Sequence, residues 1–112
     1  MKSSIIIEEN DFIALNKPSG IAVQGGSKIR RHIDGLIEHA FKNINKHYLV
    51  HRLDLETSGA LLIAKTRNCA KELSELFKTN KIEKIYIAIV CGKVKNNSGI
   101  IDLPIIKGQF GK

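Results

Sequence analysis

A chain of 112 residues is long enough for one hydrophobic core, and this length excludes an enzyme with a separate cofactor domain. Hydrophobic residues make up 43% of the chain, and no apolar run approaches the roughly 20 residues of a membrane span. Lys and Arg number 18 against 11 Asp and Glu, and the net charge of +7 favours a polyanionic partner, nucleic acid before a membrane surface.

The N-terminus and the cysteines carry no targeting or redox pattern. The chain turns acidic directly after the isoleucines at 5–7, so it has no signal-peptide core. Cys69 and Cys91 match no metal or disulfide-exchange spacing. These features predict a cytoplasmic protein with two ordinary thiols.

The first predicted element is a β-hairpin. The segment 5–8, which begins with three β-branched isoleucines, and the largely apolar segment 12–16 are separated by polar turn residues at 9–11. The segment Lys17-Pro18-Ser19-Gly20 then supplies a turn, with Pro18 suited to its second position and Gly20 to its fourth. Residues 21–23 are expected to resume a strand. Apolar residues at three- and four-residue steps over 29–44 predict an amphipathic helix, with Ser27 as its N-cap.

The second half of the chain predicts further strands around one more helix. Residues 48–50 begin a β segment, and the apolar run 60–64 is typical of a strand that is covered on both faces. A helix is expected around 68–79, and alternation predicts a strand over 82–91 and a last short one over 100–103. The inward side of that helix is expected to carry Cys69, Leu73, Leu76 and Phe77. The pattern indicates an α+β fold with a mixed, largely antiparallel sheet and flanking helices.

A dense polar segment lies between the apolar runs at 48–50 and 60–64. It reads His51-Arg52-Leu53-Asp54-Leu55-Glu56-Thr57-Ser58-Gly59. Polar loops on a rigid scaffold commonly carry function, so Asp54 is a candidate nucleophile or general base. Arg52 is a candidate to bind a phosphate or to keep a nearby carboxylate ionised. A purely structural alternative is a turn in which Asp54 caps the backbone while Arg52 pairs with Glu56.

This segment resembles the HRLDxxTSG signature of the RluA-type pseudouridine synthases. Three other stretches agree with that family in order and spacing. Residues 11–20 resemble its opening element with N-K-P-x-G, residues 84–92 its K-x-Y-x-A-x-V-x-G strand, and residues 101–105 the segment that follows. The resemblance covers essentially the whole chain from about residue 5. It implies a partial pseudouridine synthase catalytic domain.

The resemblance also implies a chemistry. Pseudouridine synthesis breaks the N-glycosidic bond of a uridine in RNA, turns the base and rejoins it through carbon, without a redox or metal step. No cofactor is therefore expected. Asp54 corresponds to the family's catalytic carboxylate, and Arg52 to the arginine that helps to turn the target nucleotide out of the RNA. Tyr86 corresponds to the tyrosine that stacks on the flipped base and assists removal of the C5 proton, and Lys84 is expected on the same strand face.

Two further residue sets leave alternatives. Lys17 lies in the turn that is near the family's active site, where it either contacts phosphate or solvates the turn. His47, His51 and Asp54 have ligand-like spacing, but cations flank them and the family uses no metal, so no metal site is expected. A glycoside hydrolase built on Asp54 and Glu56 would need carboxylates about 5–10 Å apart on opposite sides of a sugar, which a tight loop does not provide.

The family's catalytic domain is longer than this chain. Residues 1–112 are therefore expected to be the N-terminal portion of one such domain, without the S4-type RNA-binding domain that many members carry. The expected substrate is structured RNA, 23S ribosomal RNA first and tRNA second, in the bacterial cytoplasm and without membrane attachment. The alternative is a truncated, catalytically inactive remnant that at most binds RNA, because the family's later motif supplies the charge that pairs with Asp54. Neither the target uridine nor the oligomeric state is predicted.

Overall fold

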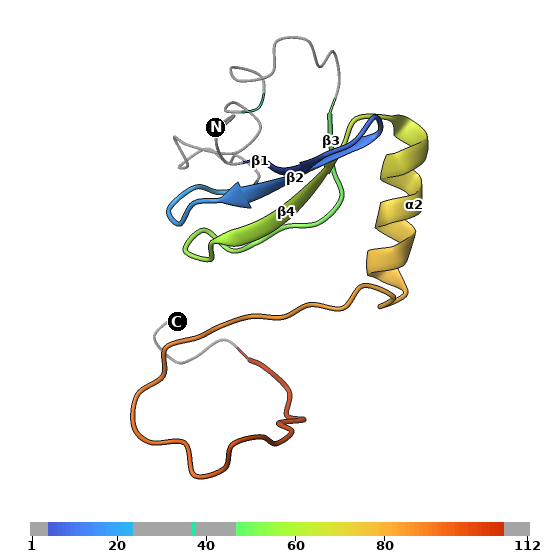
Figure 1. Ribbon diagram of the computed structural model, residues 1–112. Coiled ribbons are helices and arrows are strands. Elements are labelled where there is room, and N and C mark those ends of the chain that lie inside the picture. The colour runs from blue at the N-terminus through green and yellow to red at the C-terminus, as the bar shows by residue number, and fades with distance from the viewer. Residues whose placement is uncertain (1–4, 24–36, 38–46, 107–112) are drawn as a thin grey trace.

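The computed structural model describes residues 5–23, 37 and 47–106 (Figure 1). These residues form a four-stranded sheet and a helix that lies along its side. In chain order the elements are β1 (Ile5–Glu8), β2 (Phe12–Lys17), β3 (Tyr48–Leu49), β4 (Gly59–Ala64) and α2 (Arg67–Lys78). The sheet order is β1-β2-β4-β3 and every neighbouring pair is antiparallel. The predicted α+β class with a largely antiparallel sheet is therefore confirmed.

The predicted N-terminal hairpin is confirmed. The amide of Glu9 donates to the carbonyl of Phe12 over 2.8 Å, and this bond closes the turn between β1 and β2. β2 then pairs along its whole length with β4, from Phe12 opposite Ala64 to Lys17 opposite Gly59. Since the two strands are far apart in sequence, this pairing brings the 17–20 turn beside the polar segment that precedes β4.

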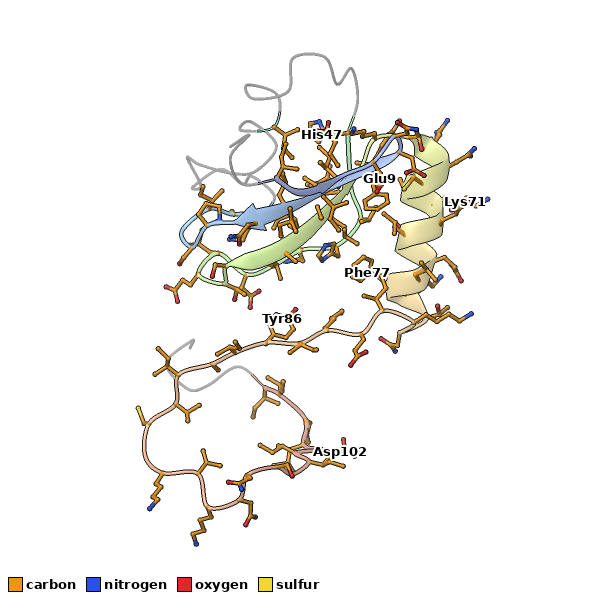
Figure 2. The ribbon with its side chains drawn as sticks, in the orientation of Figure 1. Glu9, His47, Lys71, Phe77, Tyr86 and Asp102 are labelled. Carbon is orange, nitrogen blue, oxygen red and sulfur yellow. The ribbon has the colours of Figure 1, made fainter. Side chains whose placement is uncertain are left out.

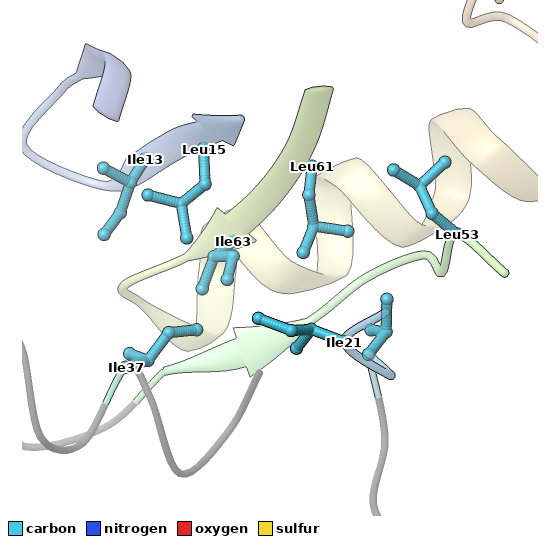
Figure 3. Packing of buried hydrophobic residues seen from close by; sticks show 8 residues of the cluster. Ile13, Leu15, Ile21, Ile37, Leu53, Leu61 and Ile63 are labelled. Atoms are coloured by element: carbon cyan, nitrogen blue, oxygen red, sulfur yellow. The ribbon is translucent and has the colours of Figure 1, made fainter. Parts of the chain in front are cut away.

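The core lies on one face of the sheet (Figure 3). Alternate residues of β2 and β4 supply its centre, because successive side chains of a strand point to opposite faces. Its buried members are Ile13, Leu15, Ile21, Val23, Ile37, Leu53, Leu61 and Ile63. Burying each of these side chains contributes roughly 1.5–3 kcal/mol. Leu53 comes from the polar segment itself, so the core anchors that segment.

The predicted second helix is confirmed as α2. The hydroxyl of Thr66 accepts from the amide of Cys69 over 3.1 Å and caps its first turn. Cys69 is buried, and Leu73 and Phe77 are half-buried, as their spacing predicts. The inward placement of Leu76 was wrong, because this side chain is 38% exposed. No helix in the described parts of the chain is long and apolar enough to cross a membrane.

Three predicted strands are wrong. Residues 82–91 and 100–103 leave α2 as extended chain that no described strand pairs with, and Figure 1 shows this chain running below the sheet without joining it. Ile87 and Ile89 are 98% and 103% exposed, so the alternating pattern has no sheet to bury either face. Residues 21–23 are buried but form only a bridge at Ala22. The helix expected over 29–44 lies outside the described residues except for Ile37, which is helical and fully buried.

Candidate functional site

The polar segment forms a loop that connects β3 to β4, and its backbone is fixed at several points. Leu53 anchors it in the core, while Arg52 and Asp54 on either side are exposed. The amide of Thr57 donates to the carbonyl of Asp54 over 3.0 Å and closes a turn. Gly59 then enters β4 with φ of +124°, a conformation that side chains beyond glycine rarely adopt. The loop therefore presents Arg52 and Asp54 to solvent from a defined backbone.

Asp54 has a carboxylate that is available for chemistry. Among residues 5–23, 37 and 47–106, its side chain makes no hydrogen bond or ion pair, and Arg52 forms no ion pair with Glu56. The purely structural alternative for this loop is therefore wrong, because the turn is closed by the backbone carbonyl of Asp54 and leaves the carboxylate uncommitted.

Lys17 lies beneath the loop and is fully buried. Its ammonium group donates to the carbonyls of Ile21, Pro18 and Leu55 over 2.6, 3.0 and 3.2 Å. Burial lowers the pKa of Lys17, since the charged form loses its hydration. Neither expected role of Lys17, a phosphate contact or a solvated turn residue, fits a cation whose donors are directed to the protein's own carbonyls.

The rest of the 17–20 turn holds the same stretch of loop. The hydroxyl of Ser19 donates to the carbonyl of Glu56, and the amide of Gly20 donates to the carbonyl of Leu55, each over 2.8 Å. Together with Lys17, these groups bind the two residues that directly follow Asp54 in the chain. The turn is therefore a clamp on the candidate catalytic loop. Sequence reasoning missed Ser19, whose partner lies 37 positions away.

His51 fixes the other end of the loop. Its Nε2 accepts from the amide of Leu62 in β4 over 2.9 Å, and its ring stacks on Phe77 of α2 with centroids 4.3 Å apart and planes 16° apart. Burial first, and the charge of Lys84 second, lower the pKa of His51. Figure 2 shows Phe77 between α2 and the sheet. Sequence reasoning weighed His51 only as a metal ligand; its place at the head of the signature was the available signal.

A groove of about 640 Å³ runs along the loop. Thr57 and Ser58 of the loop form part of one wall, and residues 82–87 form another, with Lys84 and Tyr86 among them. Tyr86 is 62% exposed and lies on the extended segment below the sheet in Figure 2. The ammonium of Lys84 is 5.5 Å from the centroid of the Phe77 ring, within cation–π range.

The expected site residues are thus brought together only in part. Lys84 and Tyr86 share the groove with the second half of the signature, whereas Arg52 and Asp54 are not among its lining residues. Lys84 and Tyr86 were expected to reach the site because they share one face of a strand. Every residue from 82 to 87 lines the groove, so a shared strand face does not explain their position. Within the described ranges, no three His, Cys, Asp or Glu side chains gather as metal ligands.

Comparison with known proteins identifies the family. The family model described as RNA pseudouridylate synthase matches residues 11–111. The ribosomal large subunit pseudouridine synthase C of Rickettsia bellii (strain RML369-C) is 41% identical over 105 residues, which cover 94% of this chain and 35% of the relative. The protein of that name from Vibrio vulnificus (strain CMCP6) is 37% identical over 113 residues, which cover 97% of this chain and 35% of the relative.

Solved structures agree with these sequence matches. Human RNA Pseudouridylate Synthase Domain Containing 4 aligns with a TM-score of 0.62 and 27% identity, over 71% of this chain and 31% of that one. The chain spans about a third of the length of the curated relatives that it matches. The family resemblance predicted from the signature is confirmed, and this chain belongs to the RNA pseudouridylate synthase family.

Proposed function

We propose that this chain carries the catalytic carboxylate of an RNA pseudouridine synthase, and that Asp54 is that carboxylate. The observation that carries the proposal is the state of Asp54. It is exposed, makes no side-chain bond to any described residue, and stands on a loop held at both ends. An ionised carboxylate in a fixed position can attack the sugar carbon of a uridine, or stabilise the positive charge that develops there.

The neighbouring residues support binding of an extruded nucleotide. A paired and stacked uridine hides its glycosidic carbon, so the base must leave the helix before the bond can be broken. Arg52 is exposed and directly precedes the buried Leu53. We propose that its guanidinium contacts a phosphate or the base and so displaces the target base from the RNA helix. Tyr86 offers an exposed ring in the groove beside the loop, on which a uracil can stack. Lys84 adds a cation to the same groove.

The proposed substrate is structured RNA, with large-subunit ribosomal RNA first and tRNA second. The two curated relatives described above are named as ribosomal large subunit pseudouridine synthases. The net charge of +7 supports a polyanionic substrate. If Lys and Arg side chains contact RNA phosphates, RNA binding should weaken steeply as the salt concentration rises. We propose that the chain constitutes the N-terminal portion of a single catalytic domain and acts without a cofactor, away from the membrane, in the bacterial cytoplasm.

The second candidate is a chain that binds RNA without catalysis. One observation favours it: within the described residues no cation pairs with Asp54 to hold the carboxylate in its reactive form and position. Both candidates predict RNA binding with a strong salt dependence, so binding alone does not separate them.

Release of tritium from RNA that contains 5-tritiated uridine separates the two, because the isomerisation exchanges the C5 proton. We expect the full chain to release tritium and Asp54→Asn to abolish release. The RNA affinity of Asp54→Asn in a filter-binding assay should stay within about threefold of that of the unsubstituted chain. Asp102→Asn removes a carboxylate that is also exposed but lies outside the loop, and it should leave both readouts unchanged. Binding without release by the unsubstituted chain would favour the second candidate, and equal release by Asp54→Asn would disprove the role of Asp54.

A further inference from the structure

His51 takes the place of a missing strand partner at the edge of β4. The pairing of β3 with β4 ends where Leu49 lies opposite Ile63. The amide of Leu62 comes next along β4, and it donates to Nε2 of His51 over 2.9 Å. An unpaired amide at a sheet edge is costly when it is shielded from water, so the imidazole satisfies a backbone group that the short β3 does not reach.

This hydrogen bond specifies the protonation state of His51. A neutral imidazole has one donor and one acceptor nitrogen, and Nε2 is the acceptor here, so the proton lies on Nδ1. A protonated imidazole has two donors and no acceptor. Protonation of Nε2 would therefore place two N–H donors opposite each other without an acceptor and break the hydrogen bond to Leu62.

The surroundings of His51 also favour the neutral form. Phe77 of α2 covers one ring face. β4 contributes no ionisable side chain, and the charged groups that line the same groove are Glu56 of the loop and Glu83 and Lys84 of the following segment. Of these, Lys84 acts together with burial to lower the pKa of His51 below its ordinary value of 6.5. The ring is thus held neutral by its contacts and by its environment.

We propose that His51 is a positioning residue for Asp54, whose neutral imidazole ties the start of the catalytic loop to β4 and α2 and whose protonation releases it. This inference rests on the proposed function of Asp54. Lys17, Ser19 and Gly20 hold the backbone just after Asp54. Among residues 51–53, directly before Asp54, the described contacts are the burial of Leu53 in the core and the hydrogen bond and ring stacking of His51. Loss of the His51 contact therefore loosens one side of the loop while the other stays clamped.

NMR spectroscopy of the ¹⁵N-labelled full chain tests the positioning directly and needs no catalysis. We expect the Nδ1–H form of His51 at neutral pH and titration with a midpoint below 6.5. The amide signals of Leu62 and of Thr57, which closes the turn at Asp54, should shift and exchange faster with the same midpoint. An Nε2–H form, or a Thr57 amide that ignores the titration, would overturn the proposal.

Two substitutions at His51 separate positioning from bulk packing. Gln offers an amide oxygen as acceptor and does not titrate, whereas Leu fills space without an acceptor. We expect His51→Gln to keep the loop signals of the neutral protein at all pH values, and His51→Leu to show the loosened signals throughout. If the proposed function holds, tritium release by His51→Leu falls by up to about 100-fold, because a displacement of about 1 Å at a catalytic group has that effect.

The same pair of variants gives a pH signature. The part of the acid limb of tritium release that coincides with the His51 titration in the unsubstituted chain should disappear in His51→Gln. Equal defects in the Gln and Leu variants would contradict the proposal. If neither the unsubstituted chain nor any variant releases tritium, the proposed catalytic role of Asp54 is wrong. The amide signals of Leu62 and Thr57 still decide whether His51 positions the loop.

Discussion

Lys17 and Leu55 are 38 positions apart in the chain and are joined by a hydrogen bond of 3.2 Å from a buried ammonium group to a backbone carbonyl. The same ammonium group binds the carbonyls of Pro18 and Ile21. This buried cation connects the turn after β2 to the loop that carries Asp54. The contact ties an exposed loop to the folded core, so its removal should affect both the stability of the fold and the position of the loop.

Replacement of Lys17 by Met tests this connection. The Met side chain fills a similar volume without donors, so the carbonyls of Ile21 and Leu55 lose a hydrogen bond in a poorly hydrated place. We expect the free energy of unfolding to fall by about 1–3 kcal/mol in urea titrations. Lys65→Met removes a half-buried cation that pairs with the exposed Glu8 over 3.3 Å and donates to the carbonyl of Glu9 over 2.7 Å, and it should cost about 1 kcal/mol or less. Equal effects of the two substitutions would contradict a special role for Lys17.

Gly59 is the residue at which the loop that carries Asp54 joins β4, and its φ of +124° should not tolerate a side chain. A Cβ atom at this position would meet nothing within 4 Å, so any penalty must come from backbone strain and not from a clash. We expect Gly59→Ala to destabilise the fold by about 1–3 kcal/mol. Gly99→Ala, also in open space but without a positive φ, should change stability by less than about 0.5 kcal/mol. Circular dichroism melts of both variants measure the difference.

The elements that the sequence predicts well are those in which local pattern and structure coincide. The hairpin follows from two short runs around a polar turn, β4 from a continuous apolar run and α2 from a helical period, each of which is visible within a dozen residues. The predicted strand over 82–91 shows the limit of such patterns. Alternation indicates which residues can share a face, but a strand forms only beside a partner with free hydrogen-bonding groups, and pairing of that kind is non-local.

The candidate site divides in the same way. The signature indicates Asp54 and Arg52 because their types and spacing are local. The partners of Lys17, Ser19 and His51 lie far along the chain or on another element. No local pattern reveals that a lysine in a turn is buried or that a histidine accepts from a strand amide. These roles follow only once β2 and β4 are paired.

Two isoleucines, one in β4 and one in the segment 82–106, differ in how much of the side chain is exposed. Ile63 in β4 is fully buried, whereas Ile87 is 98% exposed. We expect Ile63→Ala to reduce the free energy of unfolding by about 2–4 kcal/mol through lost transfer energy and an internal cavity. Ile87→Ala should change it by less than about 0.5 kcal/mol. A large effect of Ile87→Ala in urea titrations would show that this segment packs in solution and would contradict its exposure.

The two thiols should differ sharply in reactivity. Cys69 is buried at the start of α2, and burial, with smaller contributions from the charges of Asp11 and Glu72, raises its pKa. Cys91 is exposed on the extended segment. Since the thiolate is the reactive form, we expect iodoacetamide to modify Cys91 at least about tenfold faster than Cys69 under native conditions. Mass spectrometry of a time course resolves the two sites, and the difference should vanish in denaturant.

The stability of the fold should decline in mild acid because of His51. Its pKa in the folded chain is lowered from 6.5, mainly by burial and then by Lys84, so the unfolded chain binds more protons between the lowered value and 6.5. Stability therefore rises with pH across that window and reaches its full value above 6.5. We expect the urea midpoint to fall as the pH drops through the window, and His51→Gln to reduce this slope.

Lys84→Gln supplies the matched electrostatic variant. Removing this cation should raise the pKa of His51 toward 6.5 and narrow the window over which stability changes. Lys81→Gln removes a cation three positions earlier and should leave the titration midpoint of His51 where it is, since the charge that lowers the pKa of His51 is that of Lys84. If both substitutions move the His51 midpoint equally in an NMR titration, the effect comes from the net charge of the protein, and the assigned contribution of Lys84 is wrong.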